Sequence, residues 1–200
     1  MEKRIVFPGE QVAERPLRLE GCFAEDGKTY AAVVSVAQED RVIPLKGRYL
    51  PNYGDYVVGI IKDERFSGYS VELNSPYEGQ LSNRDTREEF HTGDIVLVKI
   101  MAVDEVNNAI VVEPRRLSEG EILEVESVKV PRIIGRNGSM LAILRQHTGT
   151  EIIVGKNGRI YLKGGNTTLA TLAVLKICRE AHTNGLTDRI TSFLQQESKS

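Results

Sequence analysis

The chain has 200 residues, 40% of them hydrophobic, and a formal net charge of −2, so it can bury the cores of one to three small domains. No apolar run reaches membrane-spanning length, and Cys22 and Cys178 lack the spacing of a disulfide framework or a zinc site. The first residues, MEKRIVFPGEQ, lack the apolar core of a signal peptide, so we expect a cytosolic protein. We also expect no membrane contact, no metal and no cofactor.

The charge is distributed unevenly along the chain. Residues 1–126 hold 15 Lys and Arg against 24 Asp and Glu, whereas residues 127–200 hold 11 against 4. The last third is therefore basic, as expected of a surface that attracts phosphates. Chance asymmetry is the alternative explanation, although the reversal falls at an expected domain boundary.

Residues 1–52 are expected to form a small all-β domain. Asp26-Gly27 marks a turn between two strand-like segments, Leu17–Phe23 and Thr29–Ala37. A third segment, Val42–Leu45, contains Pro44, which favours an edge strand because proline cannot donate a ladder hydrogen bond. No combination of nucleophile, base or metal ligand is visible here, so packing or docking is the default role.

Residues 53–116 have the strand and turn spacing of an OB-type barrel, whose second and third strands usually present the nucleic-acid face. Thr86 and Glu89 could form a capping box that opens a short helix before the fourth strand. The five predicted strands are Tyr56–Lys62, Tyr69–Leu73, Glu78–Leu81, Asp94–Val103 and Ala109–Val112.

The segment GDYVVGIIKDERFSGYSVEL, followed by GDIVLVKIMAVDE, resembles the RNA-binding S1-type domain. By that resemblance, two aromatic rings lie where bases stack and four basic side chains line the approach for phosphates. The rings are Phe66 and Tyr69, and the basic residues are Lys62, Arg65, Arg84 and Arg87. Two positions depart from the family pattern: Ser82 stands where many members have histidine, and Val111 where many have a basic residue. Ordinary barrel packing is the alternative role for either ring.

Residues 121–200 contain the most specific motif, a Gly-x-x-Gly loop within SVKVPRIIGRNGSMLAILRQHTG at 127–149. Pro131 suits the first turn of a short helix, and Ser139 could cap the helix that follows the loop. Gly135 and Gly138 carry no side chains, so a sugar-phosphate backbone could lie directly on the main chain at a helix start. Arg136 adds a full positive charge. Alternatively, the glycines merely end one helix and begin another.

A second Gly-x-x-Gly, Gly155-Lys156-Asn157-Gly158, lies between two β-type segments. Asn-Gly in that context is typical of a tight hairpin turn. We therefore interpret the second copy as structural and the first as the candidate site.

The order strand, helix, Gly-x-x-Gly, helix, strand, turn, strand, helix resembles the KH domain, which clamps about four nucleotides of single-stranded RNA. The resemblance implies RNA contacts at Ile134, Gly135, Arg136, Asn137 and Gly138.

The end of the chain predicts two further helices. Thr167 or Thr168 could cap the first of them, and Asn184-Gly185 would stop it. Its expected buried face is Leu169, Leu172, Ala173 and Ile177, and a short closing helix is expected around Ile190, Phe193 and Leu194.

The whole chain is a multidomain, mainly β plus α+β protein that resembles the S1/KH RNA-binding cap subunits of the archaeal exosome. The resemblance rests on VFPGEQV, RYLPNYGDYVVGIIKDE, VPRIIGRNGSM and VGKNGRIYLKG. It implies three copies on a hexameric ring of RNase PH-type subunits, with the N-terminal domains docked on the ring and the barrels around its pore. The cap would bind single-stranded RNA and guide 3′ ends inward, where the ring performs phosphorolysis.

The residue pattern also bears on two other classes of function, an enzyme and a structural adaptor. The acidic residues are scattered and do not converge on the spacing of a metal or phosphate site, so we expect no catalysis. Bacterial polynucleotide phosphorylase also carries KH and S1 domains, but in the opposite order and behind catalytic domains that this sequence lacks. A structural adaptor with little direct RNA binding is the remaining alternative.

Overall fold

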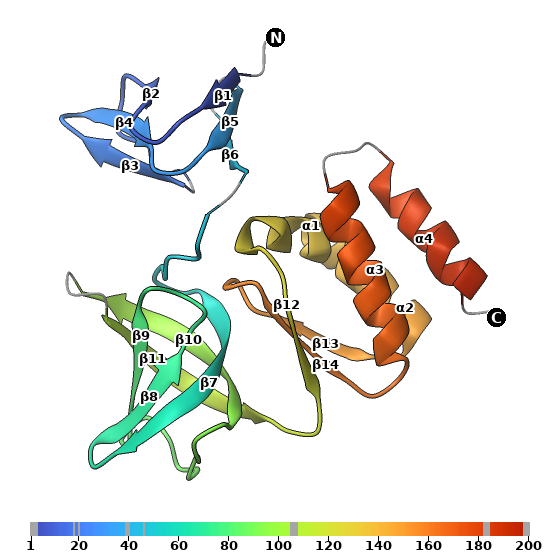
Figure 1. Cartoon of the computed structure of the whole chain (residues 1–200). Coiled ribbons are helices and arrows are strands. Elements are labelled where there is room, and N and C mark those ends of the chain that lie inside the picture. Colours follow the sequence, from blue (N-terminus) through green and yellow to red (C-terminus); the bar gives the residue numbers. More distant parts are fainter. Residues whose placement is uncertain are drawn as a thin grey trace. The chain divides into compact units, whose positions relative to one another are not determined.

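The computed structural model describes residues 4–17, 19, 21–38, 41–45, 47–104, 108–181 and 185–197. The chain divides into two compact units, Met1–Arg48 and Tyr49–Ser200 (Figure 1). None of the helices in the described ranges is long and apolar enough to cross a membrane.

The first unit contains short antiparallel strands in two sheets, with the orders β1-β5-β6 and β2-β4-β3. The strands are β1 (Arg4–Val6), β2 (Gln11–Ala13), β3 (Cys22–Glu25), β4 (Lys28–Ala31), β5 (Ser35–Gln38) and β6 (Arg41–Pro44). Val6, Ala31 and Ala37 form its small buried core, against which Val12 packs. Pro44 ends β6, an edge strand as predicted.

Two strand predictions in this unit were wrong. The segment Thr29–Ala37 is not one strand, because the chain bends at residues 32–34 and places β4 and β5 in different sheets. The segment Leu17–Phe23 contributes only the start of β3. Its first part is held instead by Thr29, whose hydroxyl accepts from the Leu17 N–H at 2.8 Å and donates to the Arg15 carbonyl at 2.7 Å.

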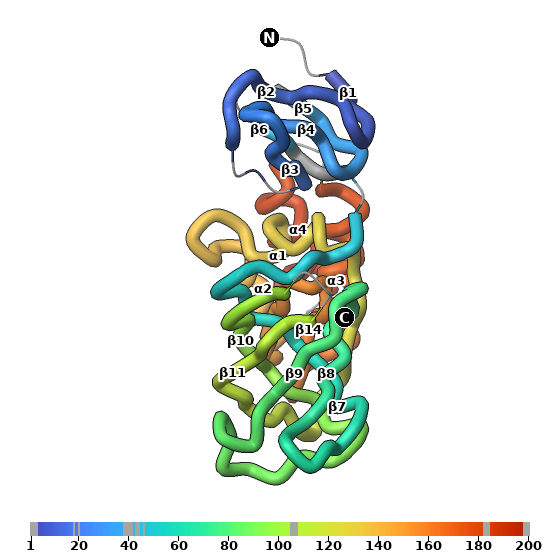
Figure 2. The backbone as a smooth tube through the Cα atoms, turned by 90° about the vertical axis from the view of Figure 1, so that its left-hand side faces the viewer, coloured from blue at the N-terminus to red at the C-terminus, as the bar shows by residue number. Residues whose placement is uncertain are grey.

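The second unit begins with a closed barrel of strand order β10-β11-β9-β8-β7, in which β10 also pairs with β7 (Figure 2). Its strands are β7 (Tyr56–Arg65), β8 (Gly68–Glu72), β9 (Glu78–Ser82), β10 (Ile95–Val103) and β11 (Asn108–Leu117). The inward residues are buried, as the period of two in a strand requires; examples are Ile61, Val71 and Val98.

Two details of the barrel differ from the prediction. The helix expected at Thr86 does not form, because the Thr86 hydroxyl accepts from the Glu88 N–H at 3.0 Å and closes a turn only two residues long. Strand β11 continues to Leu117, since its second half pairs with the start of β10 at Ile95.

The rest of the unit has the element order expected of a KH domain and an antiparallel sheet of order β12-β14-β13. Its strands are β12 (Glu121–Glu124), β13 (Glu151–Val154) and β14 (Arg159–Lys163). Its α-helices are α1 (Val130–Ile134), α2 (Ser139–Thr148), α3 (Thr167–Glu180) and α4 (Leu186–Glu197); η1 (Ser127–Lys129) and η2 (Arg136–Gly138) are 3₁₀ turns.

Both faces of this sheet are covered, and four of the five residues of β14, RIYLK, are buried. Ile160 and Leu162 belong to the core formed with the helices (Figure 1). Tyr161 points the other way and packs with Val58 and Leu117 of the barrel. The KH sheet is therefore the layer between the helices and the barrel.

The helix boundaries correct three local predictions. Asn166 caps α3, because its side chain accepts from the Leu169 N–H at 2.9 Å, whereas Thr167 is already helical. Leu172 is 49% exposed and so does not share the buried face of α3, which is completed by Ala170 and Val174. Ser139 is the first residue of α2 and makes no side-chain cap.

The remaining expectations about the helices were partly met. Pro131 lies in the first turn of α1 as predicted, and the closing helix is α4. Helix α3 ends at Glu180, before the expected stop at Asn184-Gly185. Asn184 itself lies outside the described residues.

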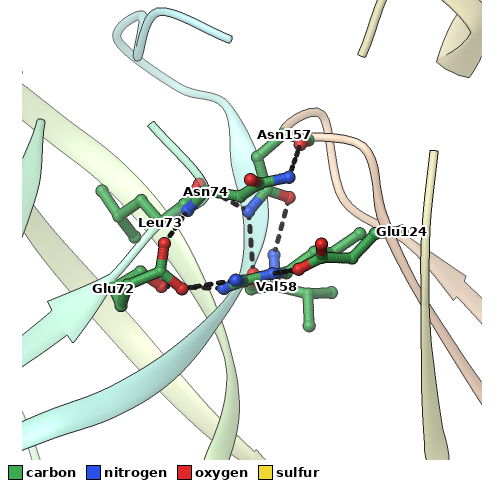
Figure 3. Close-up of polar contacts among 7 residues, drawn as sticks. Val58, Glu72, Leu73, Asn74, Glu124 and Asn157 are labelled. Carbon is green, nitrogen blue, oxygen red and sulfur yellow. Dashed lines mark hydrogen bonds and ion pairs between the residues drawn. The ribbon is translucent and has the colours of Figure 1, made fainter. Parts of the chain in front are cut away.

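The barrel and the KH domain are joined through the second Gly-x-x-Gly. It forms a hairpin turn between β13 and β14, as predicted, but its Asn157 is only 1% exposed. The Asn157 amide donates to the carbonyls of Val58 and Leu73, each at 2.8 Å, and its oxygen accepts from the Val58 N–H at 3.3 Å (Figure 3). Strand β8 pairs with β7 only from Ile60 onward, so the N–H and carbonyl of Val58 have no strand partner on that edge of β7. The Asn157 side chain supplies their hydrogen bonds instead.

Arg159 reinforces the same junction. Its side chain is 6% exposed and pairs with Glu72 of β8 and, at 2.9 Å, with Glu124 of β12. It also donates to the Glu72 carbonyl at 3.1 Å. A buried guanidinium with two carboxylates keeps its charge compensated, so the two domains are held by polar as well as apolar contacts.

Candidate nucleic-acid interface

The first Gly-x-x-Gly forms an exposed loop between α1 and α2. Gly135, Asn137 and Gly138 have φ angles of 75°, 51° and 78°, in the region where side chains are disfavoured. A Cβ on Gly135 would lie 2.7 Å from the Met140 nitrogen, so this position admits only glycine. A Cβ on Gly138 would meet no atom within 4 Å, so the left-handed backbone is the constraint at that position.

The five residues expected at this site lie together in the structure. Arg136 and Asn137 are exposed, Ile134 is half-buried beside them, and the buried Ile133 and Met140 anchor the loop on either side. Such a loop presents bare backbone with one cation at its tip, which suits a sugar-phosphate chain.

The electrostatic environment of the loop is positive. No side chain caps α2, so the positive end of its dipole is open to an anion. Within the described ranges, neither Arg132 nor Arg136 forms an ion pair, and both are exposed. These charges are therefore available to phosphates.

On the barrel, the turn between β7 and β8 presents Phe66, whose side chain is fully exposed. The Asn83 side chain donates to the Phe66 carbonyl at 3.2 Å, and the Asn83 N–H donates to the Ser67 carbonyl at 3.1 Å. These bonds place the loop that carries Arg84 next to Phe66. Arg84 and Arg87 are exposed, and neither forms an ion pair with a residue that the structure describes.

Tyr69 is less available than Phe66. Its ring lies edge-on to Phe90, with centroids 5.6 Å apart, and its hydroxyl accepts from the Phe90 N–H at 3.3 Å. The half-buried ring thus packs against the barrel core, which was the alternative weighed for it. Of the two rings, Phe66 is the fully exposed one.

Lys62 and Arg65 lie together on β7 but share an acidic neighbour. Glu78 of β9 approaches the Lys62 nitrogen to 3.4 Å and the Arg65 guanidinium to 3.5 Å. The hydroxyl of Ser70 donates a short hydrogen bond to the same carboxylate and is the main cause that lowers the pKa of Glu78. This anion therefore stays charged and partly neutralises the expected phosphate approach.

The two departures from the S1 pattern have different structural consequences. Val111 is fully buried in the barrel core, so a basic residue there would not be on the surface in this chain. Ser82 is half-buried at the end of β9, where its hydroxyl accepts from the Arg84 N–H at 3.2 Å. It orders the loop that carries Arg84.

Sequence reasoning missed three residues that shape this region. Asn157 and Arg159 were read as part of a turn and a strand, because contacts with segments about a hundred positions away leave no local pattern. Glu78 was assigned only to a strand. Its position could have indicated the role, because Glu78 lies on β9, next to β8, on the barrel face expected to bind nucleic acid.

The described residues have the features of a binding surface. Among the residues that the structure describes, no three His, Cys, Asp or Glu side chains gather as a metal site would require. The surface combines exposed cations, the exposed Phe66 ring and a loop with two glycines, which are features used in binding single strands.

Comparisons with known proteins agree with this architecture. The KH domain family matches residues 120–168. The exosome complex component Rrp4 of Thermococcus kodakarensis is 37% identical over 96% of this chain and 85% of its own length. That of Thermofilum pendens is 38% identical over 100% and 95%. A crystal structure of an exosome complex RNA-binding protein has 34% identity and a TM-score of 0.70, covering 76% of this chain and 98% of the other. The chain therefore belongs to the Rrp4 family of exosome complex components.

Proposed function

We propose that the chain is a non-catalytic RNA-binding cap subunit of an exosome in the cytosol. It binds single-stranded RNA and guides 3′ ends into a hexameric ring of RNase PH-type subunits, each ring carrying three caps. In this proposal residues 1–52 dock on the ring, while the barrel at 53–116 and the KH domain at 121–200 carry the RNA.

The loop at Gly135–Gly138 is the observation that carries the proposal. Its left-handed glycines, the exposed Arg136 and the uncapped start of α2 together form a surface that an RNA backbone fits. The basic balance of residues 127–200 supports the same assignment.

Fluorescence titration of the full chain with labelled oligo(A) at fixed salt tests the proposal. We expect saturable binding of the single strand and weaker binding of the corresponding duplex, since the loop contacts an unpaired backbone and its bases. Absence of saturable binding at low salt would argue for the adaptor alternative.

Docking on the ring is expected to depend on the exposed apolar side chains of the first unit. Ile5 and Phe7 are 58% and 57% exposed, although they flank a buried strand position. Glu at both positions should abolish co-elution of the full chain with the RNase PH-type ring, because charges would enter an apolar contact. Glu at Leu172 and Leu175, which are 49% and 42% exposed on α3, is the matched control and should leave co-elution intact.

The purified chain is expected to have no nuclease or phosphorolytic activity. Such chemistry needs converging carboxylates or a preorganised phosphate site, and the described residues show no metal-binding cluster. Labelled poly(A) incubated with the chain, magnesium and phosphate should keep its length. Shortening that survives repurification of the protein would contradict the assignment.

The structural-adaptor alternative has an observation of its own. Tyr69 is packed on Phe90, and Lys62 and Arg65 face Glu78, so the barrel offers less for RNA than its S1-like sequence implies. If the adaptor reading holds, the chain should still join the ring but show no saturable RNA binding.

A further inference from the structure

We propose that Glu78 is a built-in competitor for RNA phosphates on the barrel, occupying Lys62 and Arg65 and so limiting how tightly this surface holds a strand. The inference rests on the proposed RNA-binding function. In this inference, Glu78 determines how strongly the barrel binds RNA.

The geometry defines a four-residue cluster across three neighbouring strands. Lys62 and Arg65 come from β7, Ser70 from β8 and Glu78 from β9. One carboxylate oxygen of Glu78 faces the Lys62 nitrogen at 3.4 Å, and the other faces the Arg65 guanidinium at 3.5 Å. The carboxylate therefore lies between the two cations.

Ser70 holds the carboxylate in that place. The serine is fully buried, and its hydroxyl donates to the same Glu78 oxygen that faces Lys62. The Glu78 side chain is 32% exposed, whereas those of Lys62 and Arg65 are 58% and 48% exposed. The anion is thus fixed from below, and both cations remain within reach of a ligand from solvent.

A phosphate and a carboxylate take the same donors from lysine and arginine. An RNA phosphate reaching Lys62 or Arg65 must displace Glu78 or bind beside its negative charge. The cluster has two cations and one anion, so its attraction for RNA is reduced but not abolished.

The test is the Glu78→Gln variant of the full chain, titrated with fluorescein-labelled oligo(A). Glutamine keeps the size and the acceptor for Ser70 but removes the charge. We expect affinity to rise about threefold to tenfold at low salt. The variant frees the two cations from one exposed ion pair and removes the repulsion between Glu78 and the phosphate. The slope of log K against log salt should steepen by about 0.7 for each newly bound phosphate.

Two comparisons make the result specific. Glu64→Gln, on β7 with Lys62 and Arg65, removes a carboxylate that contacts His91 and the Thr92 N–H, and it should leave affinity unchanged. In a chain in which Lys62 and Arg65 are already changed to Gln, the further change Glu78→Gln should no longer raise affinity.

The outcomes separate this inference from the proposed function. A gain at Glu78 that depends on Lys62 and Arg65 supports it. An equal gain from Glu64→Gln, or no gain while Arg136→Asp still weakens binding, overturns the inference and leaves the RNA-binding function standing. No RNA binding by the parent chain or by Glu78→Gln overturns both.

Discussion

Replacing Arg136 with Asp is expected to weaken binding of single-stranded RNA to the full chain by about tenfold or more, because one lost charged contact is worth roughly 1.5 to 3 kcal/mol. The new carboxylate also repels the phosphate expected on Gly135 and Gly138. Folding should barely change, since Arg136 is exposed and without an ion pair among the described residues. Fluorescence titration at fixed salt measures the effect.

The matched control is Lys156→Asp. Lys156 occupies the same position in the second Gly-x-Asn-Gly, is exposed, and undergoes the same change of charge. Its loop packs on the barrel through Asn157, so its backbone is not open to RNA. A loss equal to that of Arg136→Asp would indicate general electrostatic attraction instead of a clamp, and no loss at either position would favour the adaptor.

The second large effect is expected at the junction of barrel and KH domain. Asn157→Ala should lower the free energy of unfolding by about 3 kcal/mol or more, because each buried polar group left without a partner costs roughly 1 to 3 kcal/mol. The groups concerned are the Val58 N–H and the carbonyls of Val58 and Leu73. Urea unfolding followed by far-ultraviolet circular dichroism measures it.

Asn137→Ala provides the comparison within the same motif. Asn137 is exposed and has a φ of 51°, so its replacement by Ala should cost only about 1 kcal/mol, the penalty for a left-handed backbone. Equal destabilisation by the two alanines would show that Asn157 does not hold the domains together. A smaller loss at Asn157 than at Asn137 would contradict the junction outright.

Much of the fold could be predicted because it depends on local patterns. The alternation in the barrel strands, the Asn-Gly turn after Val154 and the glycines that bracket Arg136 each leave a short-range signal. The KH order of elements follows from these signals alone. The five residues expected in the loop are adjacent in sequence, so their proximity needed no tertiary information.

Features set by competition or by distant contacts could not be predicted. Asn166 and Thr167 are both good N-cap residue types, and in the structure the Asn166 side chain is the one that caps the helix. The bend after Ala31 splits an apparently continuous strand between two sheets. Asn157 reads as a turn residue, yet its amide completes a strand edge about a hundred positions away. Glu78 lies beside Lys62 and Arg65 only after three strands have paired.

The central claim, that RNA lies on the Gly135–Gly138 loop, is tested most directly by photo-crosslinking. A single-stranded RNA containing thiouridine would be irradiated with the full chain, and the crosslinked peptides identified by mass spectrometry. We predict that crosslinks concentrate in residues 127–149, with a weaker set around Phe66, and that Arg136→Asp removes the first set. Crosslinks confined to residues 1–48, or spread evenly over the chain and unchanged by Arg136→Asp, would contradict the claim.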